Sequence, residues 1–128
     1  MALQYTNNID MLTGASPAET SVGVTATTTS QSYDVSLRRQ ITVQFHCANH
    51  TSGNGVFSID VSNDGANWVT GIGVQPVATT TPTIWVESVT LSANGSAGVY
   101  VPAGWRFIRC LCTVTTDGTY FADMEAAG

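Results

Sequence analysis

The sequence predicts an all-β, single-domain protein, an antiparallel β-sandwich or barrel, and three observations favour this class. Apolar and polar residues alternate along several short segments, as they do where a strand buries one face. Turn-forming Gly, Asn, Asp and Pro residues separate these segments at short intervals. No segment of useful length has a helical period, and the abundant Thr and Val fit a pleated sheet. A chain of 128 residues is long enough to build one core without a metal or a disulfide.

The most informative segment is residues 57–68, which we interpret as a strand, a tight turn and an aromatic side chain in direct succession. Alternate apolar residues from Phe57 to Val61 fall on one face of the strand. The Asn-Asp-Gly triplet at residues 63–65 is expected to supply the positive φ angles that reverse the chain. Trp68 is then expected to close the turn over the core.

The N-terminal residues differ from the rest in having only weak periodicity. We expect residues 1–20 to form an extended N-terminal arm or an edge strand, and residues 21–128 to form the sandwich domain. The expected strands lie near residues 21–27, 32–37, 40–48, 55–62, 68–75, 83–91, 97–101, 105–115 and 118–125.

The two faces of the strand expected at residues 105–115 differ in kind. Its inward face would carry Ile108, Cys110, Cys112 and Val114. The opposite face is too apolar for free solvent, so we expect the arm, a loop or another subunit to cover it. That opposite face carries Trp105, Phe107, Arg109 and Leu111.

The three cysteines are odd in number and each lies in line with apolar residues on one face of its strand, which favours buried, small apolar side chains over a disulfide framework. Cys110 and Cys112 project from the same side of one strand and are poorly placed to bond to each other. Cys47 follows Ile41, Val43 and Phe45 in the alternation of its own strand.

The charge of the chain disfavours two classes of partner. There is no Lys, and four Arg stand against nine acidic residues, for a net charge of −5. Nucleic acid and anionic membrane surfaces both need clustered cations, so we expect neither as a partner. The N-terminus has no secretion signal and no apolar run approaches the roughly 20 residues of a membrane span, so we expect synthesis in a cytoplasm.

The sequence offers weak candidates for metal binding or catalysis. His46, Cys47 and His50 carry metal-type side chains, but neighbours in a strand point to opposite faces and no fourth ligand is evident. Asp64 and its neighbours are better explained as turn formers than as a calcium loop. Asp123 and Glu125 share one face of a terminal strand, where charges are normally solvated. We therefore expect no metal, no cofactor and no enzymatic activity.

Two segments carry a resemblance to known proteins. The run Ser62-Asn-Asp-Gly-Ala-Asn-Trp68 after a Phe-x-Ile-x-Val strand, and the later Val101-Pro-Ala-Gly-Trp-Arg-Phe-Ile-Arg109, resemble small virion proteins of tailed bacteriophages. The first run is also similar to discoidin-like, carbohydrate-binding jelly rolls, although this chain is shorter and lacks their bracketing disulfide. The resemblance implies a jelly-roll-like β-sandwich and a capsid decoration, or cement, protein.

Such a protein would attach to the major capsid protein on the outer surface of a virion assembled in the host cytoplasm, as a homo-oligomer for which a trimer is favoured. Alternatives are a structural component of a tail, fibre or neck, and a glycan-binding β-sandwich module that uses Trp68 and Asp64. For the leading interpretation, the residues expected at contact surfaces are Tyr5, Ile9 and Leu12 in the arm and Trp105, Phe107 and Arg109.

Overall fold

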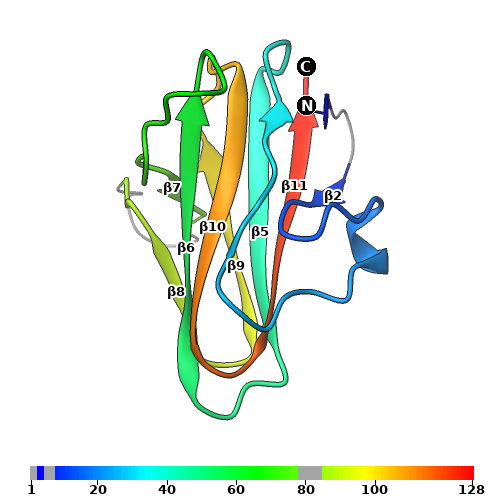
Figure 1. Ribbon diagram of the computed structural model, residues 1–128, viewed down its shortest axis with the longest axis vertical. Coiled ribbons are helices and arrows are strands. Elements are labelled where there is room, and N and C mark those ends of the chain that lie inside the picture. The colour runs from blue at the N-terminus through cyan, green and yellow to red at the C-terminus, as the bar shows by residue number, and fades with distance from the viewer. Residues whose placement is uncertain (1–2, 5–7, 78–84) are drawn as a thin grey trace.

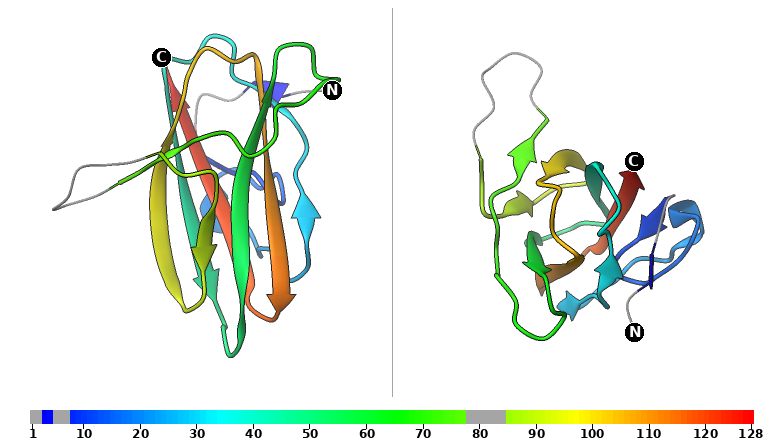
Figure 2. Two further views of the ribbon diagram at one scale, coloured as in Figure 1. Left: turned by 90° about the vertical axis from the view of Figure 1, so that its left-hand side faces the viewer. Right: turned by 90° about the horizontal axis from the view of Figure 1, so that it is seen from above.

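Strands from the whole length of the chain form two sheets that pack face to face as a β-sandwich (Figure 1, Figure 2). The computed structural model describes residues 3–4, 8–77 and 85–128. Sheet A has the order β1 (Leu3–Gln4), β4 (Tyr33–Asp34), β10 (Phe107–Thr116), β6 (Gly53–Ser62) and β8 (Val89–Leu91), and β3 (Thr28–Thr29) also pairs with β10. Sheet B has the order β2 (Ile9–Asp10), β11 (Thr119–Ala127), β5 (Gln40–Ala48), β9 (Gly95–Val101) and β7 (Gln75–Pro76).

The path of the chain between the sheets is that of a jelly roll. From β4 the chain passes to β5 in sheet B, to β6 in sheet A, to β7 in sheet B, to β8 in sheet A, to β9 in sheet B, and then to β10 in sheet A and β11 in sheet B. Strand β10 inserts between β4 and β6, and β11 inserts between β2 and β5, so each sheet places a late strand between two early ones. This nesting of Greek keys defines the jelly roll. The strand pairs are antiparallel, apart from β1 with β4.

The core lies between the sheets because the long strands alternate buried and more exposed side chains. Residues 41, 43, 45 and 47 of β5 and residues 120, 122, 124 and 126 of β11 are all buried. Aromatic rings join the two layers: the ring of Phe45 stacks on that of Phe57 with centroids 4.4 Å apart, and Phe57 meets Tyr120 edge-on at 5.9 Å. Burial of such side chains provides most of the stabilisation of a sandwich of this size.

The segment after β2 is part of the sandwich. Ile9, Met11 and Leu12 are buried in the core, and the carboxylate of Asp10 accepts hydrogen bonds from the backbone N–H groups of Leu12 at 3.1 Å and Ala122 at 3.0 Å. Thr13 and Ser21 donate their hydroxyls to the same carboxylate. Of the two expectations for residues 1–20, the edge strand is the one that residues 9 and 10 adopt.

The long strands were placed correctly from the sequence, and the short ones were not. The strand expected at residues 40–48 has those bounds, and β6, β9, β10 and β11 lie within two residues of expectation at each end. Residues 21–27 contain a single bridge from Val24 to Tyr120 in place of a strand. Residues 68–75 are mostly irregular, with bridges at Val69 and Val74 before β7 begins. Of the strand expected at residues 83–91, residues 83 and 84 lie outside the described residues and the strand itself is β8.

The expected turn after β6 is present, but its backbone φ angles and the position of Trp68 differ from the expectation. Val61 and Val69 exchange two backbone hydrogen bonds, of 3.0 and 2.8 Å, so the chain does reverse at this point. Gly65 has a φ of +75°, whereas the structure gives Asn63 and Asp64 no positive φ. Side-chain hydrogen bonds of Ser62 and Asp64 to residues of the turn stabilise it. Trp68 does not cover the core as expected and stacks on Arg109.

Within the described residues, the only helical element is the three-residue 3-10 turn η1 (Ala18–Thr20), and none of their helices is long and apolar enough to cross a membrane.

Candidate functional site

The outward face of β10 gives the structure a partly apolar outer surface on sheet A. Ile108, Cys110 and Cys112 point into the core and are fully buried, as the alternation predicted. Phe107, Arg109 and Leu111 alternate with them on the outer face, and all three are partly exposed. We call Trp68, Phe107, Arg109 and Leu111 the sheet A patch.

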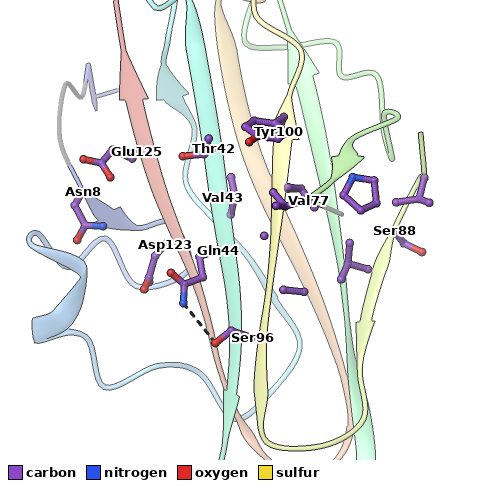
Figure 3. Close-up of a pocket in the computed structure, with 16 residues that line it drawn as sticks. Asn8, Thr42, Val43, Gln44, Val77, Ser88, Ser96, Tyr100, Asp123 and Glu125 are labelled. Carbon is purple, nitrogen blue, oxygen red and sulfur yellow. Dashed lines mark hydrogen bonds between the residues drawn. The ribbon is translucent and has the colours of Figure 1, made fainter. Parts of the chain in front are cut away.

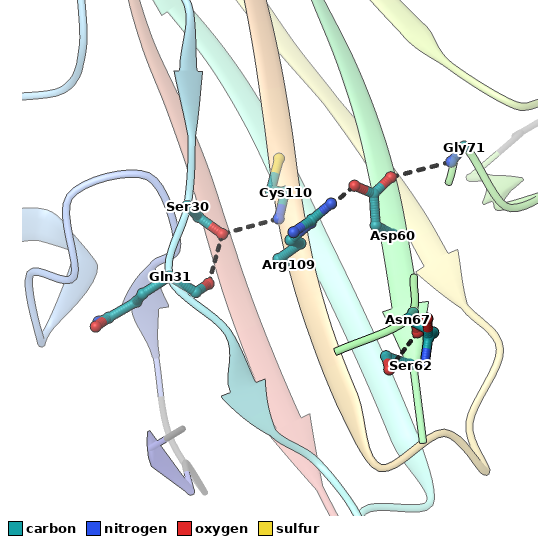
Figure 4. Close-up of polar contacts among 8 residues, drawn as sticks. All are labelled: Ser30, Gln31, Asp60, Ser62, Asn67, Gly71, Arg109 and Cys110. Atoms are coloured by element: carbon teal, nitrogen blue, oxygen red, sulfur yellow. Dashed lines mark hydrogen bonds and ion pairs between the residues drawn. The ribbon is translucent and has the colours of Figure 1, made fainter. Parts of the chain in front are cut away.

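Arg109 is held in place by two partners, Asp60 and Trp68. Its Nε donates to Oδ2 of Asp60, the cross-strand partner on β6, at 2.9 Å. The other oxygen of Asp60 accepts the backbone N–H of Gly71 at 3.0 Å, and both bonds are drawn in Figure 4. The guanidinium carbon lies 4.2 Å from the centroid of the Trp68 ring. Stacking of this kind contributes about 0.5–2 kcal/mol, so Arg109 and Trp68 form a fixed unit on the surface.

The same surface is bordered by the strand-like segment before β4. Ser30 accepts the backbone N–H of Cys110 at 2.8 Å through its hydroxyl oxygen and donates to the carbonyl of Gln31, as Figure 4 shows. A hollow of about 480 Å³ lies over the outer face of sheet A. Its lining consists of Thr29, Ser58, Asp60, Thr70, Gly71, Glu87, Ser88, Arg109 and Leu111.

The residues expected at contact surfaces are not all in one place. Phe107 and Arg109 lie on the outer face of sheet A, whereas Trp105 precedes β10 and packs against the edge of the core. Ile9 is fully buried and Leu12 is 7% exposed, so in the folded chain both side chains contact their own core. They were expected in an N-terminal arm or edge strand, and their apolar side chains are part of the buried core. Tyr5 lies outside the described residues.

The two residues of the alternative glycan site have other partners. Asp64 accepts the backbone N–H groups of Ala66 and Asn67, each at 2.8 Å, and the side-chain amide of Asn67 at 2.9 Å. These bonds hold the pKa of the Asp64 carboxyl well below its ordinary value. The oxygens of Asp64 therefore hold the turn, and one face of the Trp68 ring is stacked on Arg109.

The metal-type residues are kept apart by their strand. Cys47 is buried, His46 lies on the outer face of β5, and His50 hydrogen-bonds the carbonyl of Gly53 at 2.8 Å in the next loop. In the described part of the chain no three His, Cys, Asp or Glu residues are grouped to hold a metal ion. Nδ1 of His46 lies 2.7 Å from Oγ of Ser96.

A second surface was not expected from the sequence. Side chains of β5, β9 and β11 line a hollow of about 740 Å³ on the outer face of sheet B (Figure 3). The period-two pattern placed Thr42, Gln44 and His46 on one face of their strand, and Asp123 and Glu125 on one face of theirs. The missing information was the register that sets these faces side by side, because the strands are distant in the sequence.

Comparisons of the chain with protein-family models, with curated proteins and with solved structures each gave no match.

Proposed function

We propose that this protein is a non-enzymatic structural component of a tailed-phage virion, a decoration protein that binds the major capsid protein and stabilises the outer shell. The observation that carries the proposal is the sheet A patch. It combines an aromatic ring, a stacked guanidinium and two further apolar side chains on one face of a rigid sheet.

The chemistry of the patch suits a protein partner. Trp and Arg are enriched among the residues that dominate binding energy at protein interfaces, and Leu and Phe add apolar area around them. Because Asp60 and Trp68 already fix Arg109, little side-chain entropy is lost when a partner covers it. A surface whose side chains are already fixed in this way is better suited to binding a partner than to catalysis.

The mechanism of such a protein is mechanical. Contacts that exist only in the assembled shell stabilise that state by mass action. A homotrimer on the capsid surface would add avidity, so that weak individual contacts hold neighbouring capsid subunits together. The small share of charged residues, 10%, and the abundant Thr are compatible with many copies packed side by side.

Particles that lack the protein provide the test. Added wild-type protein is expected to cosediment with them and to raise the temperature at which they release their DNA. Leu111→Ser and Trp68→Ala remove parts of the patch and are expected to weaken both effects. Tyr100→Ser is the matched control, because Tyr100 is 42% exposed on the outer face of the other sheet. Full binding by both patch variants, or none by the wild type, would contradict the proposal.

The oligomeric state is measured separately. We expect mass photometry of the purified protein to give the mass of a trimer. A mass near the 13.4 kDa of one chain would exclude a preformed trimer and leave capsid binding to be judged from the particles alone.

A further inference from the structure

The outer face of sheet B carries a regular grid of polar side chains. Pairing of β11, β5 and β9 sets Phe121, His46 and Ser96 in one row across the sheet. The next row is Asp123, Gln44 and Gly98, and the third is Glu125, Thr42 and Tyr100. Three central strands hold these positions, so their side chains start from a rigid base.

The second and third rows, together with Ser96 of the first, line the sheet B groove, the hollow of about 740 Å³. Gly98 leaves the middle row without a side chain on β9, and the side chain of Val77 packs over that position. Val77 forms one wall, where its backbone N–H bonds the Gly98 carbonyl at 3.0 Å, and Asn8 forms the other. Figure 3 shows Asp123 and Gln44 side by side, with Tyr100 and Val77 across the groove from Asn8.

The middle row has unused hydrogen-bonding capacity. Oδ1 of Asp123 is buried and has no hydrogen-bond partner within the described residues. Its neighbour Gln44 is exposed and donates only a long bond of 3.4 Å to Ser96. An acceptor beside an amide is the pair that a hydroxyl group satisfies, because a hydroxyl donates to one and accepts from the other.

The remaining residues limit the charge and shape of a ligand. No Arg or Lys lines the groove, whereas Asp123 and Glu125 both do. An anionic ligand would be repelled and left without a cationic partner. Tyr100 offers an exposed aromatic ring at one end of the grid, and the C–H face of a sugar ring can pack on such a surface.

We propose that the sheet B groove is a binding site for a neutral saccharide. Vicinal hydroxyls contact Asp123 and Gln44, and a sugar ring packs on Tyr100. This inference goes beyond the proposed function and does not depend on it, because the two surfaces lie on opposite sheets of the sandwich.

The experiment is a glycan array that carries neutral oligosaccharides of glucose, galactose, mannose and N-acetylglucosamine together with sialylated and sulfated glycans. Wild-type protein is expected to bind neutral glycans and not the anionic ones. For a neutral oligosaccharide that binds, Gln44→Ala and Tyr100→Ser are each expected to raise the dissociation constant about tenfold or more, as loss of one ligand contact does. Trp68→Ala is the control on sheet A and is expected to bind normally.

Two further measurements keep the outcome clear. Amide chemical shifts of the wild type, titrated with the same oligosaccharide, are expected to change along β5, β9 and β11, which decides the location even if a variant folds poorly. Leu111→Ser is expected to lose particle binding and retain saccharide binding, while Tyr100→Ser does the reverse. Absence of binding to every neutral glycan, preference for anionic glycans, or shifts confined to sheet A would overturn the inference.

Discussion

Asp123 is a carboxylate that the fold holds in an unfavourable position. Burial and the nearby negative charge of Asp10 raise its pKa from 3.8 to about 6, and His46 opposes this rise. The folded state therefore holds the proton more tightly than the unfolded chain does. Between about pH 4 and pH 6 the free energy of unfolding should fall as pH rises, because the folded state binds more protons across that window.

We expect Asp123→Asn to raise the unfolding temperature at about pH 7 and to make little difference below about pH 3, where the carboxyl is protonated in both states. Thermal unfolding followed by circular dichroism across this range checks the prediction. Glu125→Gln is the matched control, because it removes one negative charge from an exposed position on the same face. An equal effect of Asp123→Asn at both ends of the range would contradict it.

The three cysteines have the burial expected of small core residues. Cys47, Cys110 and Cys112 are fully buried and form no disulfide. Removal from water raises the pKa of Cys110 well above its ordinary value and that of Cys112 to about 12. The thiolate is the reactive form of cysteine, so both burial and protonation oppose reaction of these two side chains.

We expect a disulfide exchange reagent such as Ellman's reagent to label no cysteine in the native protein at neutral pH. All three should react once guanidinium chloride unfolds the chain, and absorbance of the released thiolate measures the number. Rapid labelling of one thiol in the native protein, or a disulfide-linked dimer on a non-reducing gel, would show that a cysteine reaches the surface.

At the scale of the elements, prediction succeeded where a strand lies in the middle of a sheet. Strands β5, β6, β10 and β11 each bury one face against the opposite sheet, and that burial imposes the alternation that the sequence displays. The segments around Val24 and Val69 each pair with a long strand through a single bridge residue. So short a contact leaves no periodic pattern, and its position is decided by the tertiary structure alone.

Gly55 on β6 allows the two sheets to approach each other closely. A Cβ atom at this position would lie 2.4 Å from the ring of Tyr120 on β11, which is buried in the opposite sheet. We expect Gly55→Ala to lower the free energy of unfolding by about 1–3 kcal/mol, because the ring must move within a packed core.

Urea denaturation measures this loss, and Gly98→Ala is the matched control. A Cβ at Gly98 would meet Val77 at 3.5 Å, which is ordinary van der Waals contact, and the residue lies in a strand as Gly55 does. Equal stabilities for the two variants would show that the packing between β6 and Tyr120 is loose.

At the scale of the whole molecule, the sheet A patch and the sheet B groove both depend on residues that the sequence alone does not bring together. The sheet A patch follows from alternation within β10, and so Phe107 and Arg109 were placed on one face in advance. The stack on Trp68 and the sheet B groove require long-range register, since Gln44, Ser96 and Asp123 belong to three different strands. Alternation determines which face a residue occupies, and only the topology determines its neighbours.

The N-terminal segment is also joined to the sandwich by contacts between residues distant in the sequence. Removal of the segment tests how much these contacts stabilise the fold. Met11 donates its backbone N–H to the Ala122 carbonyl at 2.8 Å, Asp10 accepts that of Ala122, and three apolar side chains from residues 9–12 are buried. Burial of one such side chain contributes about 1.5–3 kcal/mol, and their sum approaches the roughly 5–15 kcal/mol that stabilises a whole domain.

We therefore expect a chain of residues 21–128 to lose its cooperative thermal transition and to bind a hydrophobic dye, as followed by circular dichroism and fluorescence. A chain that lacks only residues 1–7 retains Ile9, Met11 and the Asp10 contacts, and it should unfold cooperatively. If the 21–128 chain instead unfolds at the wild-type temperature, the first 20 residues are a separable arm and their contacts with β11 add nothing to the stability of the sandwich.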